Sequence, residues 1–217
     1  MNNCDPLRNQ IRDTVLTRIV DGSLAPGARV SLALLASELH VSPTPAREAL
    51  TQLEHEGFLV SEPNRGFFVA PLMLREAQDI YPIIWTLEAL AVNLQGSLSE
   101  EQVQVLQRAN NALADASDIP EEAIHLDQHW HEMLIQHCPN KLVKAEIASM
   151  KRRALRYELA YMRDSNKISF SMTQHKEILE ALMENQMAHV AQVLERHWRM
   201  SLDFLELWLR EKSRVYL

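Results

Sequence analysis

Four ionisable residues interrupt apolar stripes in the second half of the sequence. Asp127 and His131 stand four positions apart, and apolar neighbours spaced by three and four residues continue the same helix face. His175 and His197 each interrupt a later stripe of this kind. Because an apolar stripe turns toward the core of a helical domain, the four side chains are expected to point from three helices toward one interior region.

A carboxylate and three imidazoles form a set of oxygen and nitrogen donors for a metal ion. A buried carboxylate without a partner is costly, so burial of Asp127 requires one. The donor set suits Zn²⁺, Ni²⁺, Mn²⁺ or Fe²⁺, with solvent or a ligand at the open positions, and Zn²⁺ is the ion most expected in a purified sample. The spacing also allows a simpler arrangement, in which Asp127 and His131 form a hydrogen bond beside two ordinary core histidines.

Six helices are expected to position these residues. After position 71 the sequence holds a single glycine, Gly96, and its apolar residues recur at helical spacing. The predicted helices cover about 80–94, 99–113, 120–138, 140–162, 171–184 and 187–212, and an antiparallel six-helix bundle would bury their apolar faces. The buried face of the first helix is expected to consist of Ile80, Ile83, Leu87, Leu90 and Leu94.

The stretch 41–69 predicts a different element. Ser42 stands at the N-cap of a helix whose first turn accommodates Pro43 and Pro45, and Gly57 ends this helix. Two apolar runs follow, separated by the turn-rich segment 61–65. A capped helix followed by a β-hairpin indicates a winged helix-turn-helix, which places a helix N-terminus in the DNA major groove. We therefore predict a mainly α protein, with an N-terminal winged helix-turn-helix that contains a small β-hairpin and a C-terminal antiparallel six-helix bundle.

Composition and charge limit the remaining classes. The 217 residues carry a net charge of −7, and the first 70 hold six arginines against eight acidic residues. DNA binding must therefore depend on where the arginines lie. No apolar run approaches the roughly 18 residues of a membrane-spanning helix, and the N-terminal stretch lacks the layout of a signal peptide. Two cysteines are too few for a disulfide framework. These features predict a reduced, cytoplasmic location without a membrane partner.

Three segments in the first 70 positions carry a family resemblance. LAPGARV, LASELHVSPTPAREALTQLEHEGFLV and NRGFFV follow one another in the order typical of the DNA-binding domain of the GntR family of bacterial transcription regulators, which the chain resembles. The resemblance implies a DNA-binding domain over 1–71 and a homodimer on a two-fold operator in double-stranded DNA. The residues implied in DNA contact are Ser42, Thr44, Arg47, Asn64, Arg65 and Gly66. Family members usually carry an arginine where Pro43 stands, so the readout is expected to differ from the commonest type.

The helical half resembles the FCD-type domain of the FadR branch of that family. DQHWHEML and HKEILEAL are similar to its ligand segments, and His197 matches a third one. The resemblance implies a domain over 72–217 for effector binding and dimerisation. Asp127, His131, His175 and His197 would bind a divalent metal at the floor of the effector pocket. Many members have an arginine where Ile84 stands, so the usual small-carboxylate effector is in question here.

The stretch KRRALRYELAYMR offers another way to bind an acidic effector. Arg152 or Arg156 would point into the pocket and bind a carboxylate, whereas the alternative is a solvated cationic face. The function expected overall is a ligand-responsive transcription regulator, acting as a repressor and not as an enzyme. Two alternatives remain open: a constitutive DNA-binding regulator with a purely structural metal, and a metal-dependent hydrolase, for which no general base lies on the stripe of the metal ligands.

Overall fold

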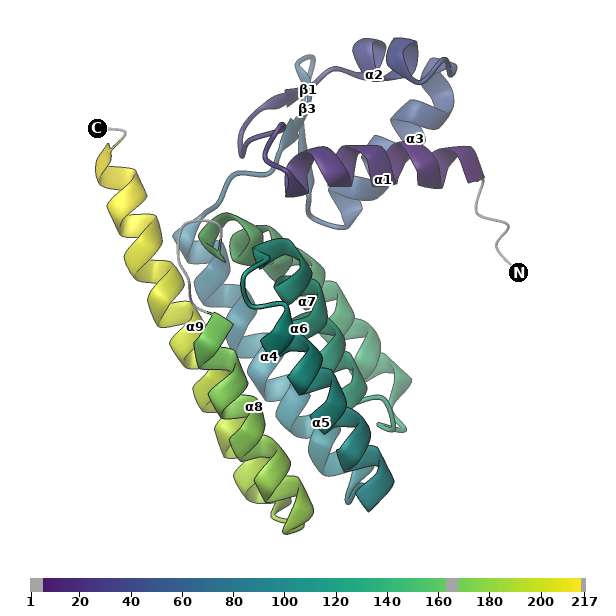
Figure 1. Cartoon of the computed structure of the whole chain (residues 1–217). Helices are drawn as coiled ribbons and strands as arrows, with labels where there is room; N and C mark the ends of the chain where they lie inside the picture. The colour runs from purple at the N-terminus through teal and green to yellow at the C-terminus, as the bar shows by residue number, and fades with distance from the viewer. Residues whose placement is uncertain (1–5, 163–167, 216–217) are drawn as a thin grey trace. The chain divides into compact units, whose positions relative to one another are not determined.

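The computed structural model describes residues 6–162 and 168–215, which form two compact units (Figure 1). The first unit ends at Met73 and the second begins at Leu74. Within the described residues, no helix is long and apolar enough to cross a membrane.

The first unit consists of three helices and a small sheet. Its elements are α1 (Pro6–Val20), β1 (Arg29–Val30), α2 (Leu32–Glu38), α3 (Pro43–His55), β2 (Leu59–Glu62) and β3 (Gly66–Val69). The strands form an antiparallel sheet in the order β1-β3-β2, with Arg29 opposite Phe68 and Leu59 opposite Val69. The sequence predicted only the β2–β3 hairpin. A third strand forms because residues 29–30, in the connection between α1 and α2, pair with the other edge of β3.

The start of α3 departs from the expected cap. Ser42 is the N-cap residue, but its hydroxyl makes no capping hydrogen bond. An N-cap oxygen normally accepts from the N–H of the second or third helical residue. Pro45 occupies the third position and has no N–H, so one of the two usual donors is missing. By contrast, the hydroxyl of Ser31 caps α2 and accepts from the amide of Leu34 at 3.3 Å.

The second unit consists of six helices that run side by side (Figure 1). They are α4 (Leu74–Gln95), α5 (Glu100–Asp115), α6 (Pro120–Leu134), α7 (Lys141–Met162), α8 (Ile168–Met183) and α9 (Met187–Val215). In this unit, α4 packs against α7 and α9, and α5 packs against α6 and α8. The predicted fold class, a winged helix-turn-helix followed by a helical domain, is confirmed. The predicted end of the third helix was four residues too late, because α6 stops at Leu134.

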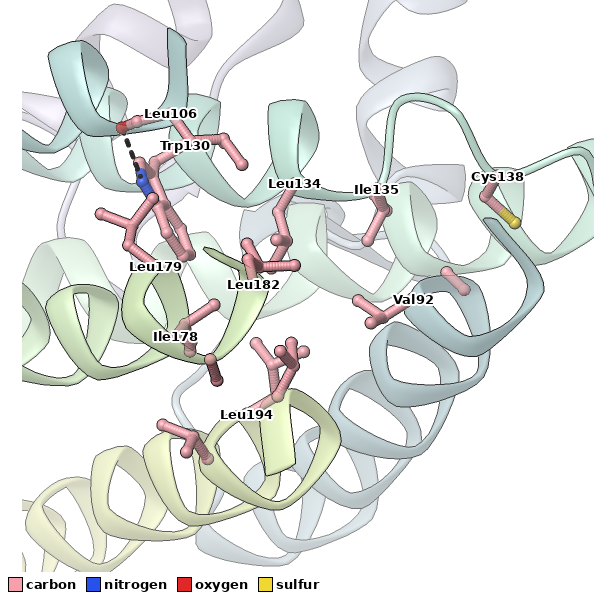
Figure 2. Packing of buried hydrophobic residues seen from close by; sticks show 14 of the residues in the cluster. Val92, Leu106, Trp130, Leu134, Ile135, Cys138, Ile178, Leu179, Leu182 and Leu194 are labelled. Atoms are coloured by element: carbon pink, nitrogen blue, oxygen red, sulfur yellow. Dashed lines mark hydrogen bonds between the residues drawn. The ribbon is translucent and has the colours of Figure 1, made fainter. Parts of the chain in front are cut away.

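The core of the helical unit is an apolar cluster built around Trp130 (Figure 2). The indole of Trp130 is fully buried and donates its N–H to the carbonyl of Leu106 at 3.1 Å. Leu134, Leu179 and Leu182, drawn in Figure 2, surround the same interior from α6 and α8. The cluster packs α6 and α8 against each other. It thereby fixes the helices that carry His131 and His175.

The buried face of α4 differs from the predicted one. Ile83, Leu90 and Leu94 are 43%, 41% and 44% exposed in the single chain. The face that is buried instead consists of Ala77, Ile80, Tyr81, Ile84, Glu88, Ala91 and Val92. Both sets recur at helical spacing, so apolar periodicity alone could not decide between them. The prediction was right for Ile80, and Leu87 packs partly buried against the core. It was wrong for the other three residues, because the buried face contains a tyrosine and a carboxylate.

Candidate metal centre and nucleic-acid interface

Three buried histidines from different helices bring their ring nitrogens together. His131 on α6, His175 on α8 and His197 on α9 each offer one nitrogen, and these atoms lie within 4.8 Å of one another. The Nε2 atoms of His131 and His197 are 3.3 Å apart. All three side chains are at most 2% exposed. The structure therefore assembles the three histidines that the apolar stripes predicted to share one interior region.

The fourth predicted ligand lies beside this cluster. An oxygen of Asp127 is 3.6 Å from Nε2 of His175, and its other oxygen is 4.0 Å from Nε2 of His131. The Asp127 side chain is 15% exposed, so it forms the boundary between the histidines and the neighbouring cavity. The Asp127 carboxylate thus lies at the edge of the three-histidine cluster, within 4.0 Å of two of its Nε2 atoms.

Each histidine is held through its other ring nitrogen. Nδ1 of His131 lies 3.1 Å from a carboxylate oxygen of Glu88. Nδ1 of His175 lies 3.2 Å from the side-chain oxygen of Asn110, and Nδ1 of His197 lies 2.8 Å from that of Gln174. All three partners are oxygen acceptors, so Nδ1 carries the proton and Nε2 presents a lone pair. Such outer partners orient metal-binding histidines and raise their basicity.

The inward-facing atoms lack the partners that a protein core normally supplies. Oδ1 of Asp127 and Nε2 of His175 are buried without a hydrogen-bond partner. Two lone pairs also face each other across the 3.3 Å between His131 and His197. Buried polar atoms are costly when unsatisfied, and a cation bound between them would satisfy all four groups at once. The residues present therefore fit a divalent metal ion better than they fit two ordinary core histidines.

Burial also shifts the protonation of the four groups. Loss of solvent lowers the pKa of each of the three histidines well below its ordinary value, and for His175 and His197 the other imidazoles add to the effect. The same desolvation raises the pKa of Asp127 to about 7, although nearby Lys151 opposes the shift. The histidines are therefore neutral near pH 7, which is the form that binds a metal.

Sequence reasoning missed the outer partners of the histidines. Glu88, Asn110 and Gln174 are respectively 0%, 7% and 4% exposed. Glu88 also accepts a hydrogen bond from the indole N–H of Trp198 at 2.7 Å, and the ammonium of Lys151 lies 3.5 Å from its other oxygen. A usable signal existed, because each of the three partners is a polar residue within an otherwise apolar stripe. The same rule that found the ligands would have found them.

A small cavity opens beside the cluster. Its volume is about 50 Å³, and Asp127 and His197 line it together with Tyr81, Tyr157 and Tyr161. The cavity is close to the inward-facing donor atoms, so a ligand in it could reach an ion held there. Among the described residues, its lining includes neither lysine nor arginine.

The two arginines predicted to bind an effector occupy different environments. Arg156 is 6% exposed, and its guanidinium pairs with Glu76, next to the hydroxyl of Tyr157, which donates to the same carboxylate at 2.6 Å. It does not line the cavity at the metal centre. Arg152 lines a second and larger cavity, of about 240 Å³, between α6 and α7. Of the two predicted arginines, Arg152 therefore lines a cavity, whereas the guanidinium of Arg156 pairs with Glu76.

In the first unit, the residues predicted to contact DNA lie at the surface. Ser42, Thr44 and Arg47 are exposed at the N-terminus of α3. Within the described residues, Arg47 makes no ion pair, whereas Arg12 pairs with Glu56 at 2.8 Å. The guanidinium of Arg47 is thus available to an external anion.

The wing is the turn between β2 and β3. Asn64 and Gly66 have φ values of 62° and 94°, the left-handed region that asparagine and glycine tolerate best. Arg65 between them is exposed; it pairs with Glu62 and lies 5.2 Å from the centre of the Phe68 ring. The predicted wing residues therefore form one tight, solvent-exposed turn.

Fold and site define a winged-helix DNA-binding protein with a helical domain that contains a buried donor cluster. Two protein families match the sequence: "Bacterial regulatory proteins, gntR family" over residues 7–69 and "FCD domain" over residues 79–200. The chain belongs to the gntR family of bacterial regulatory proteins, in the group that carries an FCD domain, and it is a DNA-binding transcription regulator.

Relatives of known sequence are regulators of the same kind. An uncharacterized HTH-type transcriptional regulator of Bacillus subtilis, YdhC, is 31% identical over 144 residues, which is 64% of each chain. The Nta operon transcriptional regulator of Aminobacter aminovorans is 28% identical over 88% of this chain and 91% of its own length. The Escherichia coli transcriptional repressor RspR is 23% identical over 91% and 88%.

Solved structures share the fold. Escherichia coli McbR/YncC superposes with a TM-score of 0.76 at 22% identity, covering 94% of this chain and 98% of the other. A GntR transcriptional regulator from Rhodococcus sp. RHA1 superposes with a TM-score of 0.73 at 20% identity, covering 91% and 96%. At this level of identity the likeness concerns the fold alone.

Proposed function

We propose that this regulator is a cytoplasmic, homodimeric repressor whose operator affinity responds to a small molecule bound beside a divalent metal ion. The observation that carries the proposal is the buried cluster of three Nε2 atoms, each oriented by an acceptor at its Nδ1. The name of RspR, a transcriptional repressor, supports the proposed repressor role.

In the proposed DNA complex, the N-terminus of α3 enters the major groove. Ser42 and Thr44 contact phosphates or base edges there, and Arg47 provides the charged contact. The wing, with Asn64, Arg65 and Gly66, reaches the adjacent backbone. Support comes from the exposure of all six residues and from the unpaired state of the Arg47 guanidinium within the described part of the chain.

Asp127, His131, His175 and His197 are the proposed metal ligands. A bound ion of the zinc, nickel, manganese or iron type supplies a Lewis-acidic centre with coordination positions left for an effector oxygen. The chain's own residues do the positioning: Glu88, Asn110 and Gln174 fix the ring orientations, and the hydrophobic cluster around Trp130 holds α6 and α8 in place.

The proposed effector site is the cavity at the metal centre. Tyr81, Tyr157 and Tyr161 line it, and a carboxylate effector there would coordinate the ion, since no arginine lines this cavity among the described residues. Effector binding would favour one arrangement of the two units and so change operator affinity.

An exposed apolar stripe supports the proposed homodimer. Ile83, Leu90 and Leu94 are spaced along one side of α4 and remain over 40% exposed in the single chain. A contiguous apolar helix face of this kind usually marks an interface. Two copies joined through the helical units would present two recognition helices to a two-fold operator.

Two experiments separate this function from a constitutive regulator with a structural metal. A DNA duplex is first selected from a random pool with the wild-type protein. Calorimetric titration of candidate carboxylates into the metal-loaded protein, followed by operator titrations at saturating effector, should then show a ligand that changes operator affinity. A protein that binds a metal and the operator, but no candidate effector, would favour the constitutive alternative.

A further inference from the structure

The larger cavity of the helical unit is separate from the metal-facing one. It has a volume of about 240 Å³ and is bounded by α6 and α7, with Glu88 contributed by α4. Of the proposed metal ligands, only His131 lines it, and Glu88, which also lines it, is bonded to Nδ1 of that residue, the nitrogen facing away from the donor cluster. A small molecule in this cavity would therefore contact the support of the metal centre rather than the metal.

The lining combines cations with an apolar wall. Lys144, Lys151 and Arg152 contribute positive charge. Ile135 and Ile147 are among the apolar side chains beside them. Of the acidic groups, Glu132 is 70% exposed and near His129, while Glu88 is fully buried. The cavity thus offers three cations to a ligand and an apolar surface to the ligand's body.

Lys151 is a buried cation with few partners. Its side chain is 8% exposed, and its ammonium lies 3.5 Å from Oε1 of Glu88 and 5.2 Å from the centre of the Trp198 ring. An ammonium has three donors, and a contact of 3.5 Å is at the limit of a hydrogen bond. No other hydrogen bond of Lys151 occurs within the described residues. Lys151 also opposes the rise that burial causes in the pKa values of Asp127 and Glu158, so its charge has carboxyl neighbours. What remains available to a ligand carboxylate is the ammonium's unused hydrogen-bond donors.

Arg152 provides the second, more accessible charge. It follows Lys151 on α7, is exposed, and makes no ion pair with any described residue. Its neighbour Arg153, in contrast, lies 3.6 Å from Glu76 and does not line the cavity. A carboxylate bound by Arg152 and Lys151 would gain charge-assisted hydrogen bonds from both.

We propose that the cavity between α6 and α7 binds a small organic anion, a carboxylate with a compact apolar body, through Arg152 and Lys151. This site is additional to the effector site at the metal. Its position gives it a route to the centre, because Lys151 contacts Glu88 and Glu88 holds His131. An anion that draws Lys151 away leaves the Glu88 carboxylate less neutralised. Its hydrogen bond to His131 then strengthens, which favours metal binding.

The probe for the test is benzoate, with benzamide as a neutral molecule of the same shape. Titrations use the full-length, metal-loaded protein and calorimetry. Benzoate is expected to bind, and benzamide to bind at least about tenfold more weakly, since it lacks the charge that the two cations recognise. Arg152→Gln should weaken benzoate binding about tenfold, whereas the matched neighbour Arg153→Gln should leave it within about twofold.

Several results would overturn the proposal. Benzoate that gives no binding up to about 10 mM, or binds no better than benzamide, would show that the cations do not form an anion site. Unchanged affinity in Arg152→Gln would place benzoate elsewhere. Because the probe could also coordinate the metal, the titration is repeated after chelation. Loss of all benzoate binding on metal removal would assign the probe to the metal-facing cavity instead.

The coupling to the metal centre has its own measurement. By thermodynamic linkage, benzoate and the metal must raise each other's affinity by the same factor, expected to be about threefold to tenfold. The factor should fall to about one in Arg152→Gln. A protein that holds no metal would contradict the proposed metal function, while benzoate binding to the metal-free chain would still decide whether this cavity is an anion site.

Discussion

The three buried imidazoles use their two ring nitrogens differently from ordinary core histidines. In a core histidine each ring nitrogen normally has a donor or acceptor; here each Nδ1 lies beside an oxygen of Glu88, Asn110 or Gln174, while Nε2 of His131 and His197 face only each other. Nε2 of His175 has no partner at all. The arrangement is stable only if something else meets the Nε2 atoms, and the neighbouring Asp127 carboxylate makes a cation the natural candidate.

At this scale, the outer partner Asn110 can be tested on its own. Asn110→Leu keeps the side-chain size but removes the acceptor that orients His175, so metal affinity should fall about 10- to 100-fold. Competition with a metal-binding dye measures the change. The adjacent Asn111→Leu is the control, because Asn111 is exposed and bonds to Gln107. Equal metal affinity in the two variants would contradict the orienting role of Asn110.

A second residue-scale prediction concerns pH. Metal binding requires an ionised Asp127, whose pKa burial raises to about 7. Apparent metal affinity should therefore fall by roughly tenfold per pH unit as pH decreases below 7, one proton being displaced. Titrations between pH 5 and 8 would show this slope, and an affinity independent of pH in that window would contradict the assignment of Asp127 as a ligand.

In the metal-free protein, Asp127 and the three histidines should change the free energy of unfolding in opposite directions as pH rises. The raised pKa of Asp127 gives stability that is present at low pH and is lost as pH rises through about 7. The lowered pKa values of the histidines give stability that is lost as pH falls below about 6.5, where the unfolded imidazoles take up protons. The stabilisation by metal, measured as a shift in Tm, should grow from pH 5 to 8.

At the scale of elements, much of the fold followed from local signals. The capping box of Ser99 and Gln102 opens α5 where the sequence predicted, and Pro120 begins α6. Four ligand candidates were also identified, because a charged or polar group in an apolar stripe is conspicuous. Most of the buried face of α4 was not predicted. Two apolar faces of this helix compete, and only tertiary packing decides which of them is covered.

The exposed apolar face of α4 is the proposed dimer interface, and a charged substitution there tests it. Leu90→Glu places a charge on the proposed dimer interface, so the protein should become monomeric in light scattering without loss of helical circular dichroism. Asn111→Glu adds the same charge at an exposed position of α5, outside the stripe, and should remain dimeric. A dimer that survives Leu90→Glu would place the interface on another face of the helical unit.

At the scale of the whole molecule, an acidic protein must bind an acidic polymer. The net charge of −7 opposes association with DNA, so attraction has to come from a few well-placed cations. Several arginines of the first unit are neutralised by neighbours, as in the pairs Arg12–Glu56 and Arg18–Glu38. The exposed Arg47 at the start of α3 has no such ion pair within the described residues. For DNA binding, its position therefore matters more than the total charge of the protein.

Replacing this arginine tests the recognition helix. Arg47→Ala should weaken binding to the selected operator by about 1–3 kcal/mol in an anisotropy titration. Arg75→Ala removes the same charge from an exposed site in the helical unit and should change operator affinity much less. If Arg47→Ala binds the operator as wild type does, α3 is not the recognition helix.

The central claim is that the helical unit of this regulator holds one divalent ion in its histidine cluster. Elemental analysis of the purified chain, beside His197→Ala and the exposed control His125→Ala, tests it most directly. We expect about one zinc-type ion per chain in the wild type and in His125→Ala, and a clear loss in His197→Ala. A wild-type protein without bound metal, whose Tm is unchanged when such an ion is added, would contradict it.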